Sequence, residues 1–288
     1  MDILITGVLL GATYSLIAMG LTLQYGVARI MNLANGEMLV AGAFGAFWVF
    51  TAQKLSPFAA ALFVVPGAFL LNWLIYRYLM RPLVRRAKNR GMLEVDTILA
   101  TFGLSFVFVG VMTFAFGGEF FTYSYLAEPY RIFGSPFGQN RLAASATAVV
   151  ICGLLYWGIH RTRPGTAMRA VAVDPTAAGL VAIDVPRVSA FAFALGGAVT
   201  ATGGIVLSTF LTMDASIGVV FTMKALIIVI MGGVGDVRGA IIAALILGIA
   251  ETAVASLVDP GLTLAAAYLL FVLVLLFRPE GLFGRRQS

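Results

Sequence analysis

The chain has 288 residues, of which 60% are hydrophobic and only 11% are charged, and its mean hydropathy is +0.98. Soluble globular proteins carry roughly 25% charged residues, so this composition excludes that class. The net charge of +6 does not indicate nucleic-acid binding, because the basic residues lie between apolar segments, where membrane orientation and anionic lipid account for them.

The apolar residues are gathered into nine segments, most of them close to the roughly 20 residues that a helix needs to cross a bilayer. Their long unbroken runs lack the period-2 alternation of a membrane β-barrel. We therefore expect an all-α, polytopic helical membrane protein that forms a single domain over residues 1–288. The expected crossings are residues 3–25, 38–52, 57–78, 98–116, 142–159, 188–211, 217–231, 240–258 and 262–277.

Glycines mark two close contacts between helices. Gly7 and Gly11 are four residues apart in the first segment, a spacing of small residues that lets membrane helices approach closely. The glycine-rich stretch 232–239 separates the seventh and eighth segments. We expect a tight hairpin there.

Basic residues predict the orientation, because short cytoplasmic loops are rich in Lys and Arg. With nine crossings and the amino terminus outside, fifteen of the nineteen Lys and Arg residues face the cytoplasm. They include the clusters at 77–90 and 161–187 and the tail arginines Arg278, Arg285 and Arg286. A single helix over 217–258 would give eight crossings and put the tail outside, which the charge asymmetry disfavours. The sequence thus predicts an outside amino terminus and an inside carboxyl terminus.

A polar interruption, YGVARIMNLANGE at residues 25–37, separates the first two apolar segments. Ionisable and amide side chains at membrane depth are costly and often mark a transport pathway, especially at a broken helix. Asn32, Asn35 and Glu37 are therefore candidates for lining or gating such a pathway. A structural alternative is that Arg29 pairs with Glu37 and holds the break together.

The loop at 161–187 is the main polar stretch on the cytoplasmic side. Asp174 and Pro175 form a helix-start signal, since an Asp side chain accepts from free backbone N–H groups and proline fits the first helical position. We expect a short helix of small and aliphatic residues at 176–183. It is either a docking surface for a cytoplasmic partner or part of an ordinary connecting loop.

Nothing in the sequence predicts catalysis, a metal site or a cofactor. The single histidine, His160, has no companion His or Cys for a metal site. The glycine turn at 232–239 lacks the Gly-Lys-Ser/Thr ending of a phosphate loop. Two charged residues remain inside apolar segments. Glu251 either lines a path or bonds to a neighbouring helix. Lys224 is likewise a functional candidate, or it extends towards the outer surface.

Four stretches together resemble the LivH-type permeases of branched-chain amino acid ABC importers. They are YGVARIMNLANGE, TRPGTAMRAVAVDPTAAGLVAIDVPRV, KALIIVIMGGVGDVRGAIIAALILG and FRPEGLFG, and their order and spacing agree with that family from end to end. The chain departs from the family at two positions. Asn35 stands where a histidine is common, and Ala182 stands where a glycine is common.

The resemblance implies a multi-pass subunit in the bacterial cytoplasmic (inner) membrane that carries no hydrolytic residue. Its implied partners are a second permease chain (LivM-like or another copy), two cytoplasmic ATP-binding subunits and a soluble substrate-binding protein. It also implies that the short cytoplasmic helix sits in a cleft of the ATPase. Ala177 and Ala178 would then lie in the cleft, with Arg169, Asp174 and Pro175 around it.

Branched-chain amino acids are the substrates that the resemblance implies, and related permeases also carry urea or short amides. A secondary transporter driven by an ion gradient is a separate alternative. It would show a carboxylate pair at the midplane and inverted repeats. Neither is evident in this sequence.

Overall fold

The computed structural model describes residues 2–87, 89–123, 125–126, 128–132 and 135–284. Within these residues, seven helical stretches are long and apolar enough to cross a membrane. This confirms a polytopic helical membrane protein. The helices that make up these stretches are α1 (Asp2–Ala28), α3 (Pro57–Ile75) with its continuation, α5 (Arg90–Phe116), α6 (Gln139–Arg161), α9 (Val185–Leu207), α11 (Val237–Leu257) and α12 (Thr263–Phe277).

Two apolar helices differ from the others because they begin inside the protein. They are α2 (Asn35–Gln53) and α10 (Gly218–Gly232). At a rise of 1.5 Å per residue, the 15 residues of α10 extend about 22 Å, which is less than the roughly 30 Å of a hydrocarbon core. The separate helices α10 and α11 confirm that residues 217–258 do not form one helix.

The third expected segment is longer than its apolar run. After α3 the chain continues through one π-helical turn, η1 (Tyr76–Met80), into α4 (Arg81–Arg86). The combined helix, Pro57–Arg86, has 30 residues and extends about 45 Å, which is more than the roughly 30 Å of a hydrocarbon core, and its last turns carry the first arginines of the basic cluster.

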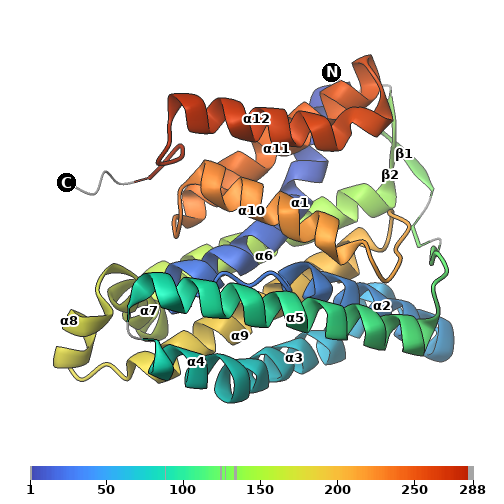
Figure 1. Ribbon diagram of the computed structural model, residues 1–288. Helices are drawn as coiled ribbons and strands as arrows, with labels where there is room; N and C mark the ends of the chain where they lie inside the picture. The colour runs from blue at the N-terminus through green and yellow to red at the C-terminus, as the bar shows by residue number, and fades with distance from the viewer. Residues whose placement is uncertain (1, 88, 124, 127, 133–134, 285–288) are drawn as a thin grey trace.

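The centre of the molecule is built around α1 and α9, with α11 and α2 packed against them (Figure 1). Glycine makes the closest of these contacts possible. A Cβ atom on Gly7 would lie 2.6 Å from Cα of Ile249, and one on Gly11 would lie 2.7 Å from Cα of Leu245. The expected close approach at Gly7 and Gly11 is confirmed, and the neighbour is α11.

The glycine-rich stretch forms the expected tight hairpin between α10 and α11. Gly233 and Gly235 have φ angles of 105° and 81°, in the left-handed region that glycine adopts without steric cost. Gly232 and Gly239 face each other so closely that a side chain on either would meet the backbone of the other.

The two ends of the molecule differ. A short antiparallel hairpin, β1 (Pro129–Ile132) with β2 (Ser135–Gly138), lies within the loop between α5 and α6, an addition to the expected all-α fold. Helix α1 begins towards this end, whereas α12 ends at the opposite end, where α7 (Arg163–Val173) and α8 (Pro175–Leu180) also lie (Figure 1). Of the basic residues used to predict the orientation, Lys88, Arg285 and Arg286 lie outside the described residues.

The loop at 161–187 contains two helices, so the expectation of one short helix is corrected. Thr162 caps α7 by accepting from the N–H of Gly165 at 3.2 Å, and Pro164 sits in its first turn. The sequence Thr162-Arg163-Pro164 was thus a second helix-start signal. Helix α8 stops at Leu180, before the expected end at 183, because Ala182 has a φ of 61° and reverses the chain.

Candidate functional site

The polar interruption between the first two apolar segments forms a helix break at residues 29–34, between the end of α1 and the start of α2. Arg29 leaves α1 with a left-handed φ of 57°. Hydroxyl groups of two other helices bond the irregular backbone. The Leu33 N–H donates to Thr101 Oγ1 of α5 at 3.1 Å, and Thr222 Oγ1 of α10 lies 3.2 Å from the Leu33 carbonyl. Irregular backbone is tolerated at membrane depth only where protein supplies such partners.

Asn32 holds the break in shape. Its Nδ2 donates to Gln24 Oε1 of α1 at 2.9 Å, and its Oδ1 accepts from the N–H of Ala34 at 3.0 Å. Gln24 in turn donates to the carbonyl of Phe193 in α9 at 3.2 Å. With both ends of its amide engaged, Asn32 has a structural role in this arrangement.

Asn35 and Glu37 are buried but keep unused bonding capacity. The two residues are 0% and 1% exposed, compared with 2% for Asn32. Asn35 Oδ1 accepts from Thr200 Oγ1 of α9 at 3.0 Å, but its Nδ2 has no hydrogen-bond partner among the described residues. The two carboxylate oxygens of Glu37 also have no hydrogen-bond partner among the described residues. The alternative in which Arg29 pairs with Glu37 is therefore absent from the described structure.

The starts of α2 and α10 meet at this place. The Gly36 N–H donates to Thr222 Oγ1 at 2.8 Å, and a Cβ atom on Gly218 would lie 2.5 Å from Glu37 Oε2. Each helix start carries a partial positive charge, which favours a nearby anion. The two helix starts thus offset part of the cost of burying the Glu37 carboxylate, which has no hydrogen-bond partner among the described residues.

A second buried polar cluster connects three helices. Lys224 Nζ of α10 lies 2.8 Å from Glu251 Oε2 of α11 and 2.8 Å from the Tyr14 hydroxyl of α1. The Tyr14 hydroxyl donates to the same Glu251 oxygen at 2.8 Å. The hydrogen bond expected for Glu251 is therefore present. The alternative in which Lys224 extends to the outer surface is wrong, because an ion pair holds its ammonium group inside.

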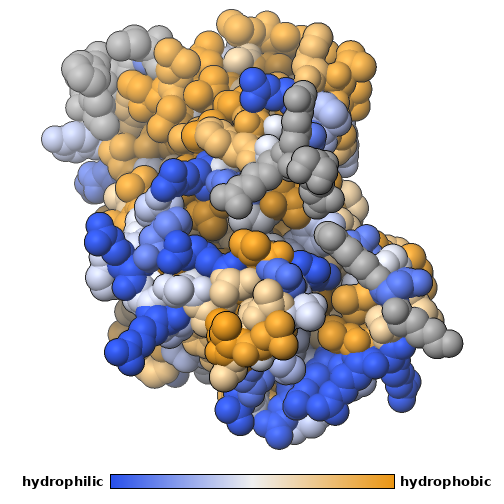
Figure 2. All heavy atoms as spheres, turned by 90° about the vertical axis from the view of Figure 1, so that its left-hand side faces the viewer, coloured by the Kyte–Doolittle hydropathy of each residue, from blue (hydrophilic) through white to orange (hydrophobic). Residues whose placement is uncertain are grey.

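The end of the molecule with α7 and α8 presents apolar side chains outward. Val173, Leu180 and Val181 are 73%, 85% and 70% exposed. Figure 2 views this end of the molecule and shows a hydrophobic patch at the level of α8, bordered by hydrophilic residues. An exposed apolar patch with a polar rim is typical of a protein interaction site.

The residues predicted for ATPase contact have different positions on this end. Asp174 caps α8, with Oδ1 accepting from the N–H groups of Thr176 and Ala177 at 2.8 and 3.1 Å, and Pro175 stands in the first turn. Ala177 is exposed. Arg169 is also exposed, and it donates to Thr166 and to the backbone of its own chain.

Ala178 requires a correction. It is only 3% exposed and packs in a core cluster with Leu23, Val27, Met168 and Ala192. A helix as short as α8 turns one side towards its own protein, and Ala178 is on that side. It does not lie in a cleft of a partner in this arrangement.

A family profile described as "Branched-chain amino acid transport system / permease component" matches residues 3–277. The chain belongs to this family. The resemblance to LivH-type permeases is therefore confirmed, and the family is one of transport permeases, not of enzymes.

Relatives of this permease are similar over nearly their full length. The high-affinity branched-chain amino acid transport system permease protein LivH of Salmonella typhimurium is 29% identical, covering 98% of this chain and 94% of its own. The corresponding protein BraD of Pseudomonas aeruginosa is 30% identical, with 99% and 95% covered. A probable branched-chain amino acid transport permease protein LivH of Methanocaldococcus jannaschii is 25% identical, with 93% and 88% covered.

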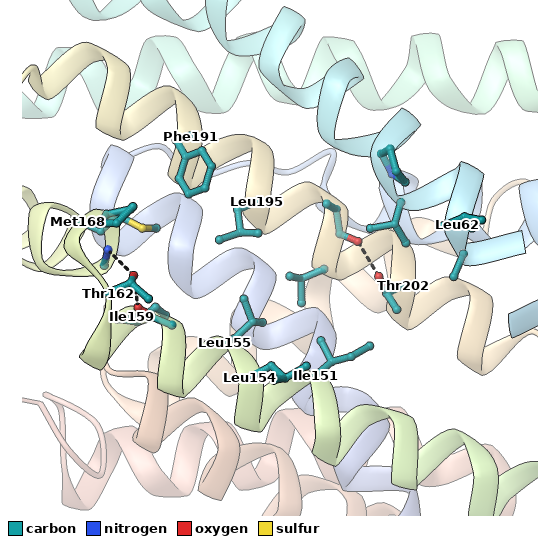
Figure 3. A pocket seen from close by; sticks show the side chains of 18 of the residues that line it. Leu62, Ile151, Leu154, Leu155, Ile159, Thr162, Met168, Phe191, Leu195 and Thr202 are labelled. Carbon is teal, nitrogen blue, oxygen red and sulfur yellow. Dashed lines mark hydrogen bonds between the residues drawn. The ribbon is translucent and has the colours of Figure 1, made fainter. Parts of the chain in front are cut away.

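The permease also has a groove of about 980 Å³ between α3, α6, α7 and α9 (Figure 3). Aliphatic and aromatic side chains such as Leu62, Leu154 and Phe191 line it. Its two threonine hydroxyls are already engaged, Thr162 with the Gly158 carbonyl at 2.6 Å and Thr202 with the Ala198 carbonyl at 2.9 Å. The groove therefore offers mainly apolar contact.

Sequence reasoning identified the break but missed the residues of other helices that bond to it. These are Gln24, Thr101, Thr200 and Thr222. Each lies in a segment dominated by apolar residues, and a hydroxyl or amide in such a segment is a signal for an interhelical bond. The sequence contains many hydroxyl and amide side chains in apolar segments, and it does not show which of them bond to one another.

Proposed function

We propose that this chain is the membrane-spanning permease subunit of an ABC importer for branched-chain amino acids in the bacterial cytoplasmic membrane. The observation that carries the proposal is the family match over residues 3–277, together with relatives named as branched-chain amino acid permeases over nearly the whole chain. The chain would work with a second permease chain, two cytoplasmic ATP-binding subunits and a soluble substrate-binding protein.

Uptake into proteoliposomes that contain the reconstituted importer tests this function. ATP-dependent accumulation of leucine, isoleucine or valine is the expected result. Accumulation of urea or short amides, without these amino acids, would identify the other substrate class of the family. Uptake that follows an ion gradient and ignores ATP would reject the ABC importer altogether.

The proposed topology has nine crossings, by α1, α2, α3, α5, α6, α9, α10, α11 and α12, with the amino terminus outside and the carboxyl terminus inside. The positive-inside rule supports it, because the basic residues around α4 and α7 then face the cytoplasm. Reporter fusions after Ser288 measure the side directly. A periplasmic signal there is incompatible with nine crossings.

We place the translocation pathway at the helix break, where Asn35 and Glu37 have unused bonding capacity beside the starts of α2 and α10 and Asn32 shapes the backbone. Transporters build binding sites from discontinuous helices of this kind near the membrane centre. The proposed route lies at the interface with the partner permease, and the two helix starts separate when the pathway opens.

Coupling to the ATPase is assigned to the surface formed by α7 and α8, including Arg169, Asp174, Pro175 and Ala177. The exposed apolar side chains of Val173, Leu180 and Val181 support this assignment. Leu180→Glu should abolish co-purification of the ATPase while leaving permease levels normal. Val258→Glu is the matched control, since Val258 is also exposed but follows α11 at the other end of the protein. Normal ATPase binding by Leu180→Glu would remove this surface from the interface.

A further inference from the structure

The apolar groove between α3, α6, α7 and α9 is open at the surface of the protein. Leu62 of α3 and Leu154 of α6 line it and are 73% and 62% exposed. In Figure 3, Met168 and Thr162 lie at one end of the groove and Leu62 lies towards the other. An open apolar surface of this kind marks a site of contact with the membrane or with another protein.

The length of the groove corresponds to one leaflet of the bilayer. Its lining residues run from Ile151 to Thr162 along α6 and its end, and from Phe191 to Thr202 along α9. At a rise of 1.5 Å per residue, each of these stretches extends about 16 Å, close to half of the roughly 30 Å of a hydrocarbon core. An acyl chain of one leaflet matches this length, whereas a membrane-crossing helix of a second chain is about twice as long.

Basic residues stand at the α7 end of the groove. Thr162 lines the groove and lies between Arg161 and Arg163 in the chain, so the Cα atoms of both arginines are about 4 Å from its own. Both arginines are exposed, and among the described residues neither side chain has a hydrogen bond or an ion pair. Arg187, at the start of α9, is already paired with Asp184 at 2.9 Å. The proposed topology puts this end at the cytoplasmic leaflet, where basic clusters attract anionic lipid headgroups.

We propose that this groove holds an acyl chain of an anionic phospholipid from the cytoplasmic leaflet, with the headgroup phosphate at Arg161 and Arg163. A planar guanidinium group donates two parallel hydrogen bonds to a phosphate, so arginine suits this contact. The hydroxyls of Thr162 and Thr202 need no partner from the lipid, because both already donate to backbone carbonyls. Met168 of α7 lines the same groove, so the bound chain also contacts the helix next to the proposed coupling surface. The binding does not depend on which solute the permease carries.

Native mass spectrometry of the purified full-length permease tests the headgroup contact, with phosphatidylglycerol and phosphatidylcholine of identical acyl chains as probes. At about fivefold per basic residue near an anionic headgroup, two arginines should make phosphatidylglycerol bind about 25-fold more tightly. Arg161→Gln with Arg163→Gln should reduce this preference to within about threefold. Arg85→Gln with Arg86→Gln, the same loss of two exposed charges on α4, should leave it unchanged, since neither residue is among those that line the groove.

Filling the groove tests the acyl-chain contact separately. Gly158 lines the groove, and a Cβ atom there meets no packed neighbour among the described residues within 4 Å, so Gly158→Phe places a ring in the groove without a backbone clash. It should weaken the binding of phosphatidylglycerol at least tenfold. Gly153→Phe is the matched control, because Gly153 lies in the same helix with equally open space, and it is not among the described residues that line the groove.

The same lipid should also co-purify with the complete importer. Equal affinity of the wild type for the two lipids would overturn the proposal, as would phosphatidylglycerol binding by Gly158→Phe equal to that by Gly153→Phe. Lipid retained by the isolated permease but absent from the complete importer would overturn it too, since a partner chain would then occupy the groove. The arginine variants change only exposed side chains, so they decide the question if Gly158→Phe does not fold.

Discussion

Replacing Glu251 by Gln should strongly destabilise the permease. The Lys224 ammonium and the Glu251 carboxylate are 2.8 Å apart, and their side chains are only 11% and 4% exposed. At that distance and an effective dielectric constant of 20, their attraction is about 6 kcal/mol. Desolvation of both groups offsets much of it, but removing one partner leaves the other charge buried. We therefore expect Glu251→Gln to lower the free energy of unfolding by about 3–5 kcal/mol.

The double variant Lys224→Met with Glu251→Gln separates the charge effect from a simple packing defect. Gln at position 251 can still accept from the Tyr14 hydroxyl, and Met fills most of the volume of the Lys stem. Because no charge is then left buried, the double variant should recover at least about 2 kcal/mol relative to Glu251→Gln alone. Such recovery is the sign of a coupled pair.

The assay is SDS-induced unfolding of the purified permease in mixed micelles, with the free energy of unfolding compared between variants. Arg187→Met is the matched control, because it breaks the Arg187–Asp184 pair of similar length, 2.9 Å, whose Arg side chain is 87% exposed. That change should cost no more than about 1 kcal/mol. A Glu251→Gln variant within 1 kcal/mol of the wild type, or a double variant no more stable than the single one, would refute the reasoning.

Three further predictions concern close packing and backbone strain. Gly11→Ala should destabilise the permease by about 1–3 kcal/mol in the same assay, because its Cβ meets the α11 backbone, whereas Gly103→Ala, with no described atom within 4 Å, should be neutral or stabilising. Ala182→Gly should stabilise by about 1 kcal/mol by relieving the left-handed φ of 61°, and an unchanged unfolding midpoint would argue against strain there. Ala178→Trp should lower the amount of folded permease in the membrane, since Ala178 is buried, and normal levels would show that α8 can rearrange.

Much of the architecture was determined by the sequence itself. Segment length and hydropathy specify which stretches are helical, because every backbone polar group in a bilayer must be bonded within its own helix or to protein. The cap at Asp174, the hairpin at 232–239 and the close approach at Gly7 and Gly11 are equally local. Each depends on a single residue type with one physical property, a short oxygen-bearing side chain or a missing Cβ.

The partners of buried groups were decided only by the tertiary structure. Lys224 is two turns from the start of α10 and Glu251 lies near the end of α11, and no periodicity shows that they meet at 2.8 Å beside Tyr14. In the same way, Asn32, Asn35 and Glu37 look alike in sequence, yet both ends of the Asn32 amide are hydrogen-bonded while Glu37 has no hydrogen-bond partner among the described residues. Ala178 faces inward and Ala177 outward for a similar reason. A helix pattern gives the spacing of side chains around an axis, whereas the neighbours that the helix packs against decide which side is covered.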